Sequence, residues 1–466
     1  MNFQTLIKSS LFLALFVFMV SCAEPNEPEL ENPEPKSEIL MINTWISDIM
    51  NDYYFWYDMI PSERQPDSLT DPKNYFYSLL YTQEDKWSFI TDDYTGLMAE
   101  FSGTPVSMGF APAFGQFSNT GNIFIIVVYV YKNSPAETAG LKRGDIILKI
   151  NNQEMTPDNY KELYSQEQYE VSLGHFDGSS ISETNNTLSL TAQQLTIDPI
   201  LFDTIYQDYN GKNIAYFCLS EFLNKEPFVS HVQPVIEEIK SKGIRDVIID
   251  LRYNTGGALD AAAWLASSLA PQATLDNHSV LVELLFNNKL QPYMEQENET
   301  KYYFDNTVAS NLNLDNIYFL TTNYMTASAS ELIITGLEPY MEVIQVGENT
   351  AGKYTGMWAI PDLETPARHN YGIMPIVMKY ANAVGYTDFK EGLIPDHLVE
   401  DNLLSALPLG HVDDPQIATA LNLIAGLIGK KHSTVKESIP FILLNTPEKE
   451  LKSNLFIKPP VSQLDN

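Results

Sequence analysis

Cysteine, basic side chains and long apolar runs are all scarce in this chain of 466 residues. Lys and Arg total 28 against 60 Asp and Glu, and the net charge of −32 argues against nucleic acid as a partner, and against an anionic membrane surface. Two cysteines and seven scattered histidines form no spacing typical of zinc ligands, so we expect no metal site and no cofactor. Hydrophobic residues make up 44%, enough for a substantial core, and the length allows about three domains.

The N-terminus carries a targeting signal, which we assign to residues 1–21. Lys8 precedes the apolar run 11–20, which is too short for a transmembrane span and is typical of a secretory signal. The run ends in MVSC, which resembles the lipobox of bacterial lipoproteins and implies that Cys22 is acylated and anchors the chain to a membrane. A plain secretory signal with an incidental Cys22 is the alternative. Ala23 follows the cysteine, so we expect a cell-envelope lipoprotein in the outer membrane.

Two further regions precede the first β-rich module. Residues 22–38 are rich in Pro and Glu and cannot bury a core, so we expect a flexible tether. Residues 39–105 are expected to form a helical domain, with one amphipathic helix over 40–61 and another over 71–86. If Cys22 carries lipid, Cys218 has no disulfide partner within the chain and is expected to be a buried core residue.

Residues 106–198 are expected to form a β-rich module. The segment 123–131 (IFIIVVYVY) predicts a strand, and a proline-started helical turn is expected to end at Gly140. The sequence SPAETAGLKRGDIILKIN, beginning at residue 134, resembles a PDZ domain. The resemblance implies a groove that binds an extended peptide as an added strand and holds its carboxylate at the loop Met108-Gly109-Phe110. A PDZ fold used only as a spacer or lid is the alternative.

Strands and helices alternate over residues 199–410, which predicts an α/β core of layered sheet and helices. The remaining residues, 411–466, are expected to hold one helix at 415–428 and a polar, proline-containing end. The predicted fold class is a multidomain α/β protein with an N-terminal helical segment, a PDZ-like β-rich module and this core. Within the core we predict strands at 214–219, 245–252, 317–321 and 341–347, and helices at 228–243, 258–269 and 328–337.

The candidate chemistry lies in the segments TASASE and AGK, which contain Ser328 and, 25 positions later at 353, a lysine. A serine hydroxyl becomes a nucleophile when a neutral lysine takes its proton, and a dry pocket keeps the lysine neutral by lowering its pKa. Ser328 is predicted where a strand turns into a helix, so the amide of Ala329 would point at an oxygen held beside it. Gly256 or Gly257 would supply the second amide of an oxyanion hole. Capping the helix is the simpler role for Ser328.

Four motifs, DVIIDLRYNTGG, TNYMTASASELI, NTAGK and EGLIPD, resemble the S41 family of serine peptidases, the carboxyl-terminal-processing or tail-specific proteases. The resemblance covers about residues 106–400. It implies an S41 peptidase core that cleaves polypeptides, with Ser328 as the nucleophile and Lys353 as the general base. It also implies an oxyanion hole made by the amides of Ala329 and of Gly256 or Gly257.

Position 357 departs from that family's pattern. Typical members carry a glutamine four residues after the lysine, thought to orient it, whereas this chain has Met357. Either a Ser–Lys pair suffices or another group orients Lys353, and Thr355 is a candidate by proximity alone. The alternative to an active serine endopeptidase is therefore a PDZ lipoprotein with a weak or inactive site that acts as a peptide-binding scaffold.

Two other enzyme classes fit the sequence less well. Residues 347–353 (GENTAGK) match a phosphate-binding loop, but Tyr354 stands where a Ser or Thr should bind magnesium, so we expect no nucleotide partner. A Ser-His-Asp hydrolase would be expected to carry a G-x-S-x-G motif, which does not occur, and His397 is the nearest candidate histidine.

Overall fold

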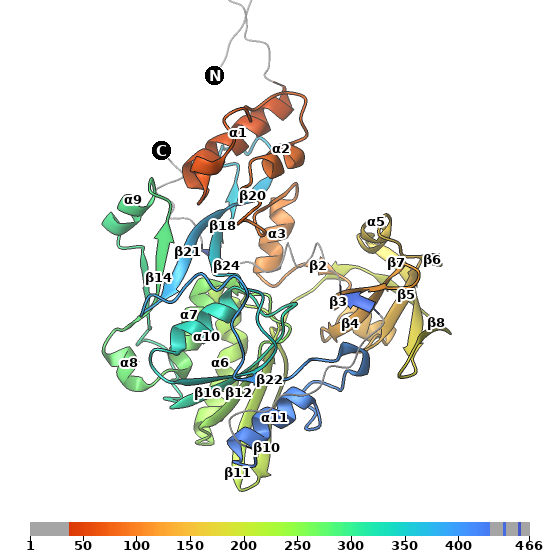
Figure 1. Ribbon diagram of the computed structural model, residues 1–466, viewed down its shortest axis with the longest axis vertical. Coiled ribbons are helices and arrows are strands. Elements are labelled where there is room, and N and C mark those ends of the chain that lie inside the picture. The colour runs from red at the N-terminus through yellow and green to blue at the C-terminus, as the bar shows by residue number, and fades with distance from the viewer. Residues whose placement is uncertain (1–36, 429–440, 444–454, 458–466) are drawn as a thin grey trace, which may run out of the picture.

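The computed structural model of the chain describes residues 37–428, 441–443 and 455–457. The predicted signal, Cys22 and nearly all of the predicted tether therefore lie outside the described residues. Figure 1 shows a helical N-terminal segment at the top, a β-rich module to one side and a layered core of helices and strands below. The predicted fold class is confirmed. Among the described helices, none has both the length and the hydrophobicity that crossing a membrane requires.

The N-terminal segment is helical and is joined to the core by a strand. Helix α1 (Glu38–Tyr53) begins at Ser37, whose side chain caps it. It stops short of the predicted end at residue 61, because the Phe55 amide donates to the carbonyl of Ile376 in the core. Helix α2 (Pro72–Ser78) covers only part of the predicted helix 71–86. Strand β1 (Phe89–Thr91) pairs with the core strand β20 (Gly372–Met374), and helix α3 (Tyr94–Phe101) follows it.

The β-rich module is one antiparallel sheet with two short helices. Helix α4 (Pro135–Ala139) follows the prediction, since Ser134 caps its start and Gly140, at φ 91°, ends it in the left-handed conformation. The second short helix is α5 (Tyr160–Tyr164). The strand order is β23-β3-β4-β5-β7-β8, and β6 pairs with β5. The strands are β3 (Phe110–Phe117), β4 (Ile123–Val130), β5 (Ile146–Ile150), β6 (Gln153–Glu154), β7 (Gln168–Phe176), β8 (Ile181–Thr191) and β23 (Phe441–Leu443). Separately, β2 (Val106–Ser107) pairs with β9 (Gln193–Gln194).

A six-stranded sheet forms the centre of the core, and different helices cover its two faces. Alternate side chains of β11 (Lys212–Leu219) point to opposite faces. Phe217 packs with residues of α6, α7 and α10, whereas the buried Cys218 packs with residues of α11. The order is β10-β11-β12-β16-β17-β22, and the elements are β10 (Ile200–Tyr209), β12 (Asp246–Asp250), β16 (Asn316–Thr321), β17 (Glu342–Gly347), β22 (His397–Leu398), α6 (Lys225–Ser241), α7 (Leu259–Leu269), α10 (Ala329–Leu337) and α11 (Pro415–Ile424).

A second six-stranded sheet, which the sequence analysis did not predict, lies against α10. Its strands come from three separated stretches of the core and from the C-terminal tail. The order is β13-β24-β18-β21-β14-β15. The strands are β13 (Gly257–Ala258), β14 (Val280–Phe286), β15 (Lys301–Tyr303), β18 (Thr355–Trp358), β21 (Ile376–Asn382) and β24 (Leu455–Ile457). Outside this sheet, the remaining elements are α8 (Gln272–Asp276), α9 (Gln291–Gln296), β19 (Ile360–Pro361) and two 3-10 turns at 57–59 and 403–405.

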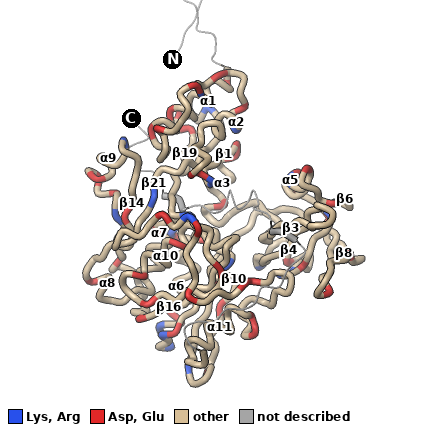
Figure 2. Tube along the Cα trace, viewed as in Figure 1, with Lys and Arg blue, Asp and Glu red and all other residues tan. Residues whose placement is uncertain are grey.

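The acidic side chains are spread over every part of the described chain (Figure 2). The net charge of −32 therefore acts as a general negative field and not as one acidic patch. Such a field favours protonated lysines, so a lysine that is to act as a base must be held neutral by its immediate surroundings.

Candidate active site

Ser328 lies in a strained turn between β16 and α10. Its backbone has φ 62° and ψ −111°, a conformation that residues with a side chain rarely adopt. Strain of this kind is typical of hydrolase nucleophiles that stand between a strand and a helix. Ser328 and Glu331 have the arrangement of a capping box, but the buried Ser328 hydroxyl has no hydrogen-bond partner. The hydroxyl is therefore not engaged in capping the helix in this conformation.

The buried carboxylate of Glu331 joins Ser328 to Lys353. Its Oε2 atom accepts hydrogen bonds from the amides of both residues, at 2.7 Å and 2.8 Å. The two amide nitrogens therefore lie within 5.5 Å of each other, the sum of those two bond lengths. Oε1 accepts from the amide of Gly352 at 2.7 Å and from the hydroxyl of Thr350. Burial raises the pKa of Glu331, and these four donors oppose that rise because they favour the carboxylate form.

Tyr380 makes a second connection between the same two residues. Its hydroxyl, on strand β21, lies 3.2 Å from the carbonyl oxygen of Ser328 and 3.4 Å from that of Lys353. The tyrosine is fully buried, so water does not compete for these contacts. The nucleophile and the lysine are thus held through their backbones from two sides.

Lys353 is fully buried, and burial lowers the pKa of its ammonium group well below the usual value. The nearby carboxylates of Asp85 and Glu331 oppose that shift. The ammonium nitrogen lies 5.2 Å from the centre of the Trp87 ring. A neutral lysine is the form that can accept a proton from a serine hydroxyl. The arrangement therefore suits a lysine base.

Asp85 and Trp87 come from the N-terminal segment, far from Lys353 in the sequence. The Asp85 carboxylate is buried and accepts from the hydroxyl of Tyr54 at 2.8 Å and from the amides of Trp87 and Ser88 at 2.9 Å. These bonds fix the loop that carries the Trp87 ring. Sequence reasoning missed both residues, because no local motif connects an EDKWS segment to a lysine more than 260 positions away.

Neither Met357 nor Thr355 orients the lysine through a hydrogen bond. Met357 is fully buried in β18 and packs in the large hydrophobic cluster of the core. Thr355, which the sequence analysis put forward by proximity, has a buried hydroxyl without a hydrogen-bond partner, so that suggestion is wrong. The groups that the structure places around Lys353 are instead Trp87, Asp85 and Glu331.

The glycine pair packs directly against Ser328. A Cβ atom at Gly256 would lie 2.7 Å from the Ser328 Cβ and 3.1 Å from the amide nitrogen of Ala329. At Gly257, where φ is 134°, a Cβ would lie 2.0 Å from the carbonyl oxygen of Phe222, so both positions require glycine. The structure thus brings together the residues predicted to surround the oxyanion.

Only part of that predicted oxyanion hole is open in this conformation. The amide of Gly256 donates to the Asn254 side chain at 2.9 Å, and the same oxygen accepts from Ser330 at 3.0 Å. Ala329 is the first residue of α10, so its amide has no partner inside the helix. The Gly256 amide must leave Asn254 before it can bind an oxyanion.

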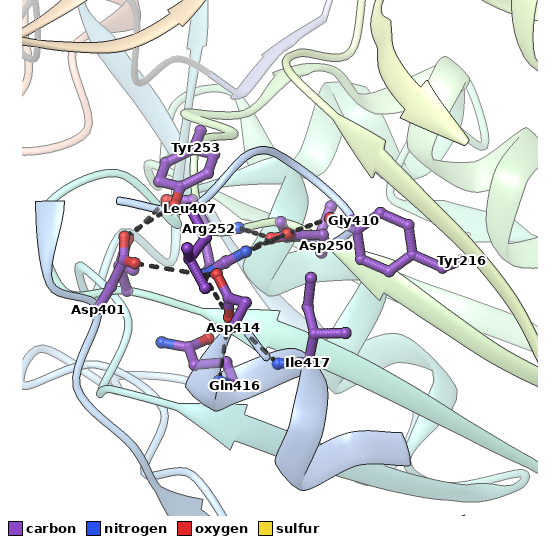
Figure 3. A network of polar contacts seen from close by, with 12 residues as sticks. Tyr216, Asp250, Arg252, Tyr253, Asp401, Leu407, Gly410, Asp414, Gln416 and Ile417 are labelled. Carbon is purple, nitrogen blue, oxygen red and sulfur yellow. Dashed lines mark hydrogen bonds and ion pairs between the residues drawn. The ribbon is translucent and has the colours of Figure 1, made fainter. Parts of the chain in front are cut away.

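A buried ion network anchors the loop that carries the glycine pair (Figure 3). The Arg252 guanidinium bonds the carboxylates of Asp250 at 2.8 Å, Asp414 at 2.9 Å and Asp401 at 3.2 Å. Asp401 also accepts from the hydroxyl of Tyr253 at 2.9 Å. Arg143 of the β-rich module donates to that same Tyr253 hydroxyl. The network therefore ties the glycine loop to the core and to the PDZ-like module.

One cavity of about 470 Å³ is lined both by the loop predicted to hold a peptide carboxylate and by the glycine pair. Its lining includes Met108, Phe110, Gly256 and Gly257. Gly109 has φ 83°, and its amide donates to the Ser107 side chain at 3.0 Å. The cavity therefore extends to the glycine pair that packs against Ser328, while Ser328 itself is buried.

The two competing enzyme readings receive no support from the geometry. Strand β18 follows Lys353, not the helix that a phosphate-binding loop needs, and Glu331 already occupies the amides of Gly352 and Lys353. His397 lies in β22 and pairs with Val346 at the outer strand of the six-stranded sheet.

Three family profiles match the chain in the order that the sequence analysis expected. The Peptidase S41 N-terminal domain matches residues 41–89, the PDZ domain matches residues 126–171, and Peptidase family S41 matches residues 213–399. The chain thus combines a PDZ domain with an S41 peptidase core.

Known proteases resemble the chain in sequence and in fold. It is 28% identical over 312 residues to a carboxyl-terminal-processing protease of Synechocystis sp. (66% of each chain) and 25% identical over 275 residues to the carboxy-terminal processing protease CtpA of Bacillus subtilis (58% of this chain, 52% of that one). A crystal structure from Bacteroides fragilis assigned to the S41 proteases matches with a TM-score of 0.67 at 25% identity, over 83% of this chain and 98% of that one. The predicted relationship to S41 serine peptidases is confirmed, although the chain spans less than two thirds of the length of these curated relatives.

Replacing the buried lysine should stabilise the fold. Because the folded-state pKa of Lys353 is lowered, the wild-type protein loses stability as the pH falls from the unfolded value near 10.5 towards the folded value. We expect Lys353→Met to raise the free energy of unfolding at pH 7 by on the order of 1 kcal/mol or more, and by less at pH 9. Urea unfolding at the two pH values measures this. An equal or lower stability of the variant at pH 7 would show that the lysine is charged in the folded protein.

Removing the central arginine should strongly destabilise the core. Arg252→Met leaves three carboxylates without their cation, and we expect a loss of roughly 3–5 kcal/mol in urea unfolding. The matched control is Arg245→Met, which breaks an exposed pair with Asp315 and should cost less than about 1 kcal/mol. Similar losses in both variants would contradict the anchoring role of the network.

Proposed function

We propose that this chain, which carries an S41 peptidase core, is a serine endopeptidase that cleaves polypeptides with a Ser328–Lys353 dyad. The observation that carries the proposal is the shared attachment of the two backbones to Glu331 and Tyr380 around a buried lysine. The names of the curated relatives support carboxyl-terminal processing as the type of reaction.

The proposed reaction is acyl transfer to serine. Neutral Lys353 takes the proton of the Ser328 hydroxyl, and the oxygen attacks the peptide carbonyl. The amide of Ala329 and one amide of the glycine pair stabilise the negative charge on the carbonyl oxygen. The tetrahedral intermediate collapses, and the lysine gives its proton to the departing amine. Water, deprotonated by the same lysine, then hydrolyses the ester and frees the serine.

Groups from the N-terminal segment take over the orienting role that a glutamine has in typical S41 peptidases. The Trp87 ring offers its face to the lysine nitrogen, and the Asp85 carboxylate holds the loop on which the ring stands. Met357 adds apolar surface and no hydrogen-bond donor, which keeps the pocket dry. In this arrangement an apolar residue at position 357 is compatible with activity.

The setting is proposed to be the bacterial envelope. The MVSC sequence at 19–22 supports a lipid anchor at Cys22, and Ala23 supports the outer membrane. The PDZ domain would receive the polypeptide at Met108 and Phe110 and pass it along the cavity to the glycine pair. Unfolded chains and exposed C-terminal ends are the substrates that such a path accepts.

The first test is cleavage of an unfolded protein by residues 23–466 purified without lipid. We expect fragments of casein from the wild-type protein, and a loss of at least about 10³-fold in rate from Ser328→Ala and from Lys353→Ala. Gel electrophoresis and mass spectrometry of the fragments provide the measurement. Ser230→Ala, in the exposed face of α6, is the control that should retain activity, because its hydroxyl donates to the Pro227 carbonyl and lies outside the site. A folded wild-type protein that yields no fragments would favour the peptide-binding scaffold.

Asp85 should set the pH at which activity is lost. Its negative charge raises the pKa of Lys353, so Asp85→Asn should lower that pKa. The rate falls at acidic pH as the lysine becomes protonated, and we expect the variant to move this fall by roughly one pH unit towards lower pH. Rates measured between pH 5 and pH 9 test this. Asp92→Asn removes an equal but exposed charge and should leave the profile in place. A rate that does not change over this range would exclude lysine as the base.

A further inference from the structure

The C-terminal tail adds a strand to the PDZ domain at its peptide-binding edge. Strand β23 pairs antiparallel with β3, with Phe441 opposite Phe117 and Leu443 opposite Gly115. In Figure 1 it is the short blue strand beside β3. Strand β3 begins at Phe110, directly after the loop predicted to hold a peptide carboxylate, and its Phe114 ring contacts Tyr160 of α5 at 5.4 Å. The antiparallel direction leads the tail towards that loop, as it would lead a bound peptide.

The tail adds another strand beside the serine site. Strand β24 pairs in parallel with β13, with Leu455 opposite Gly257, and with β18, with Phe456 opposite Met357. In the sheet order it stands between β13 and β18. Without it, these two strands would border a gap one strand wide. The gap runs from the glycine pair to the strand that starts two residues after Lys353.

The PDZ edge and this gap belong to one path. The lining of the cavity described above includes Phe110 and Phe114 of β3 as well as Gly256 and Gly257. An extended polypeptide that pairs with β3 therefore borders the same cavity as the glycine pair. Both positions bind through main-chain hydrogen bonds, which accept many sequences.

The sequence of the tail suits it to these positions. Residues 429–466 contain six lysines and four acidic residues, which gives them a net charge of +2. Because the whole chain has a net charge of −32, residues 1–428 carry −34. The apolar stretches FIL (441–443) and LFI (455–457) form the two strands, and the sequence has prolines at 440, 447 and 459. A polar tail of small positive charge, with two short apolar stretches, is thus attracted to an acidic body.

We propose that the tail is a resident ligand of the peptide path: β23 fills the PDZ edge, β24 fills the gap beside the glycine pair, and substrates must displace both. The ligand class of the two positions is an extended polypeptide. The proposal rests on the proposed function only for its effect on cleavage, since occupancy of the path is a matter of binding. A peptidase whose own tail occupies the path would be inactive until a competing polypeptide displaces the tail.

Displacement is tested by peptide binding in the full-length protein with Ser328→Ala, so that nothing is cleaved. The probe is a fluorescent peptide of residues 437–447, followed by anisotropy. Of any two consecutive strand amides one faces the partner strand, so Ile442→Pro with Leu443→Pro removes a ladder bond of β23 whatever its register. We expect this variant to bind the probe at least about tenfold more tightly than the parent. The control, Ser433→Pro with Thr434→Pro, changes the tail outside both strands and should bind like the parent.

Equal affinities in all three proteins would overturn the proposal. If the variant fails to fold, hydrogen exchange on the parent decides instead. A saturating amount of the probe should speed amide exchange in residues 441–443, because the bound peptide has displaced them, and unchanged exchange would mean that β23 is a permanent strand.

The active serine protein separates this inference from the proposed function. If the tail competes with substrates, the paired proline variant should cleave casein several-fold faster than the wild type, while the control matches the wild type. Tighter probe binding without any cleavage would support the resident tail and contradict the peptidase. If the paired proline variant and the wild type cleave casein equally fast, the result would support the peptidase and contradict competition between the tail and substrates.

Discussion

One buried carboxylate, that of Glu331, determines whether the rest of the site can exist. Two residues 25 positions apart meet because their amides bind the same oxygen atom, at 2.7 Å and 2.8 Å. All four partners of the carboxylate are donors, and the hydroxyl of Thr350 is free to donate because it accepts from the amide of Leu393 at 2.8 Å. Burial raises the pKa of the Glu331 carboxyl, and the four donors oppose that rise because they bind the charged form. In the charged form these hydrogen bonds are charge-assisted, which makes them stronger than bonds between neutral groups.

The same charge has an electrostatic consequence at Lys353. Burial lowers the pKa of the Lys353 ammonium, and an amine whose pKa is lowered far is a weak base. The carboxylates of Asp85 and Glu331 oppose this effect of burial and raise the pKa. A useful base thus requires both a dry pocket and nearby negative charge, and the structure supplies them from different segments: hydrophobic core residues on one side, Asp85 on the other.

Local motifs were sufficient to predict the serine turn, the glycine pair and the S-x-x-E spacing, because each depends on conformations that neighbouring residues impose on one another. The strained backbone of Ser328 and the close approach of Gly256 follow from that local chemistry. Contacts between distant segments were not predictable. The second sheet was not predicted because β18 and β21 are buried on both faces and lack the alternation of apolar and polar residues that marks a half-buried strand. Trp87 and Asp85 were not predicted as site residues because only the tertiary fold brings them to the lysine.

Position 357 shows why a departure from a family pattern has to be weighed against the whole site. A glutamine there would need hydrogen-bond partners, and a buried amide without them would cost about 1–3 kcal/mol. Met357 needs none, and its side chain packs in the large hydrophobic cluster of the core. The backbone of the same residue pairs with Phe456 of β24. The groups near Lys353 that come from the N-terminal segment are Trp87 and Asp85, and the pairing of β1 with β20 joins that segment to the core. Loosening this connection would separate Lys353 from both groups while leaving Ser328, Glu331 and the glycine pair in place.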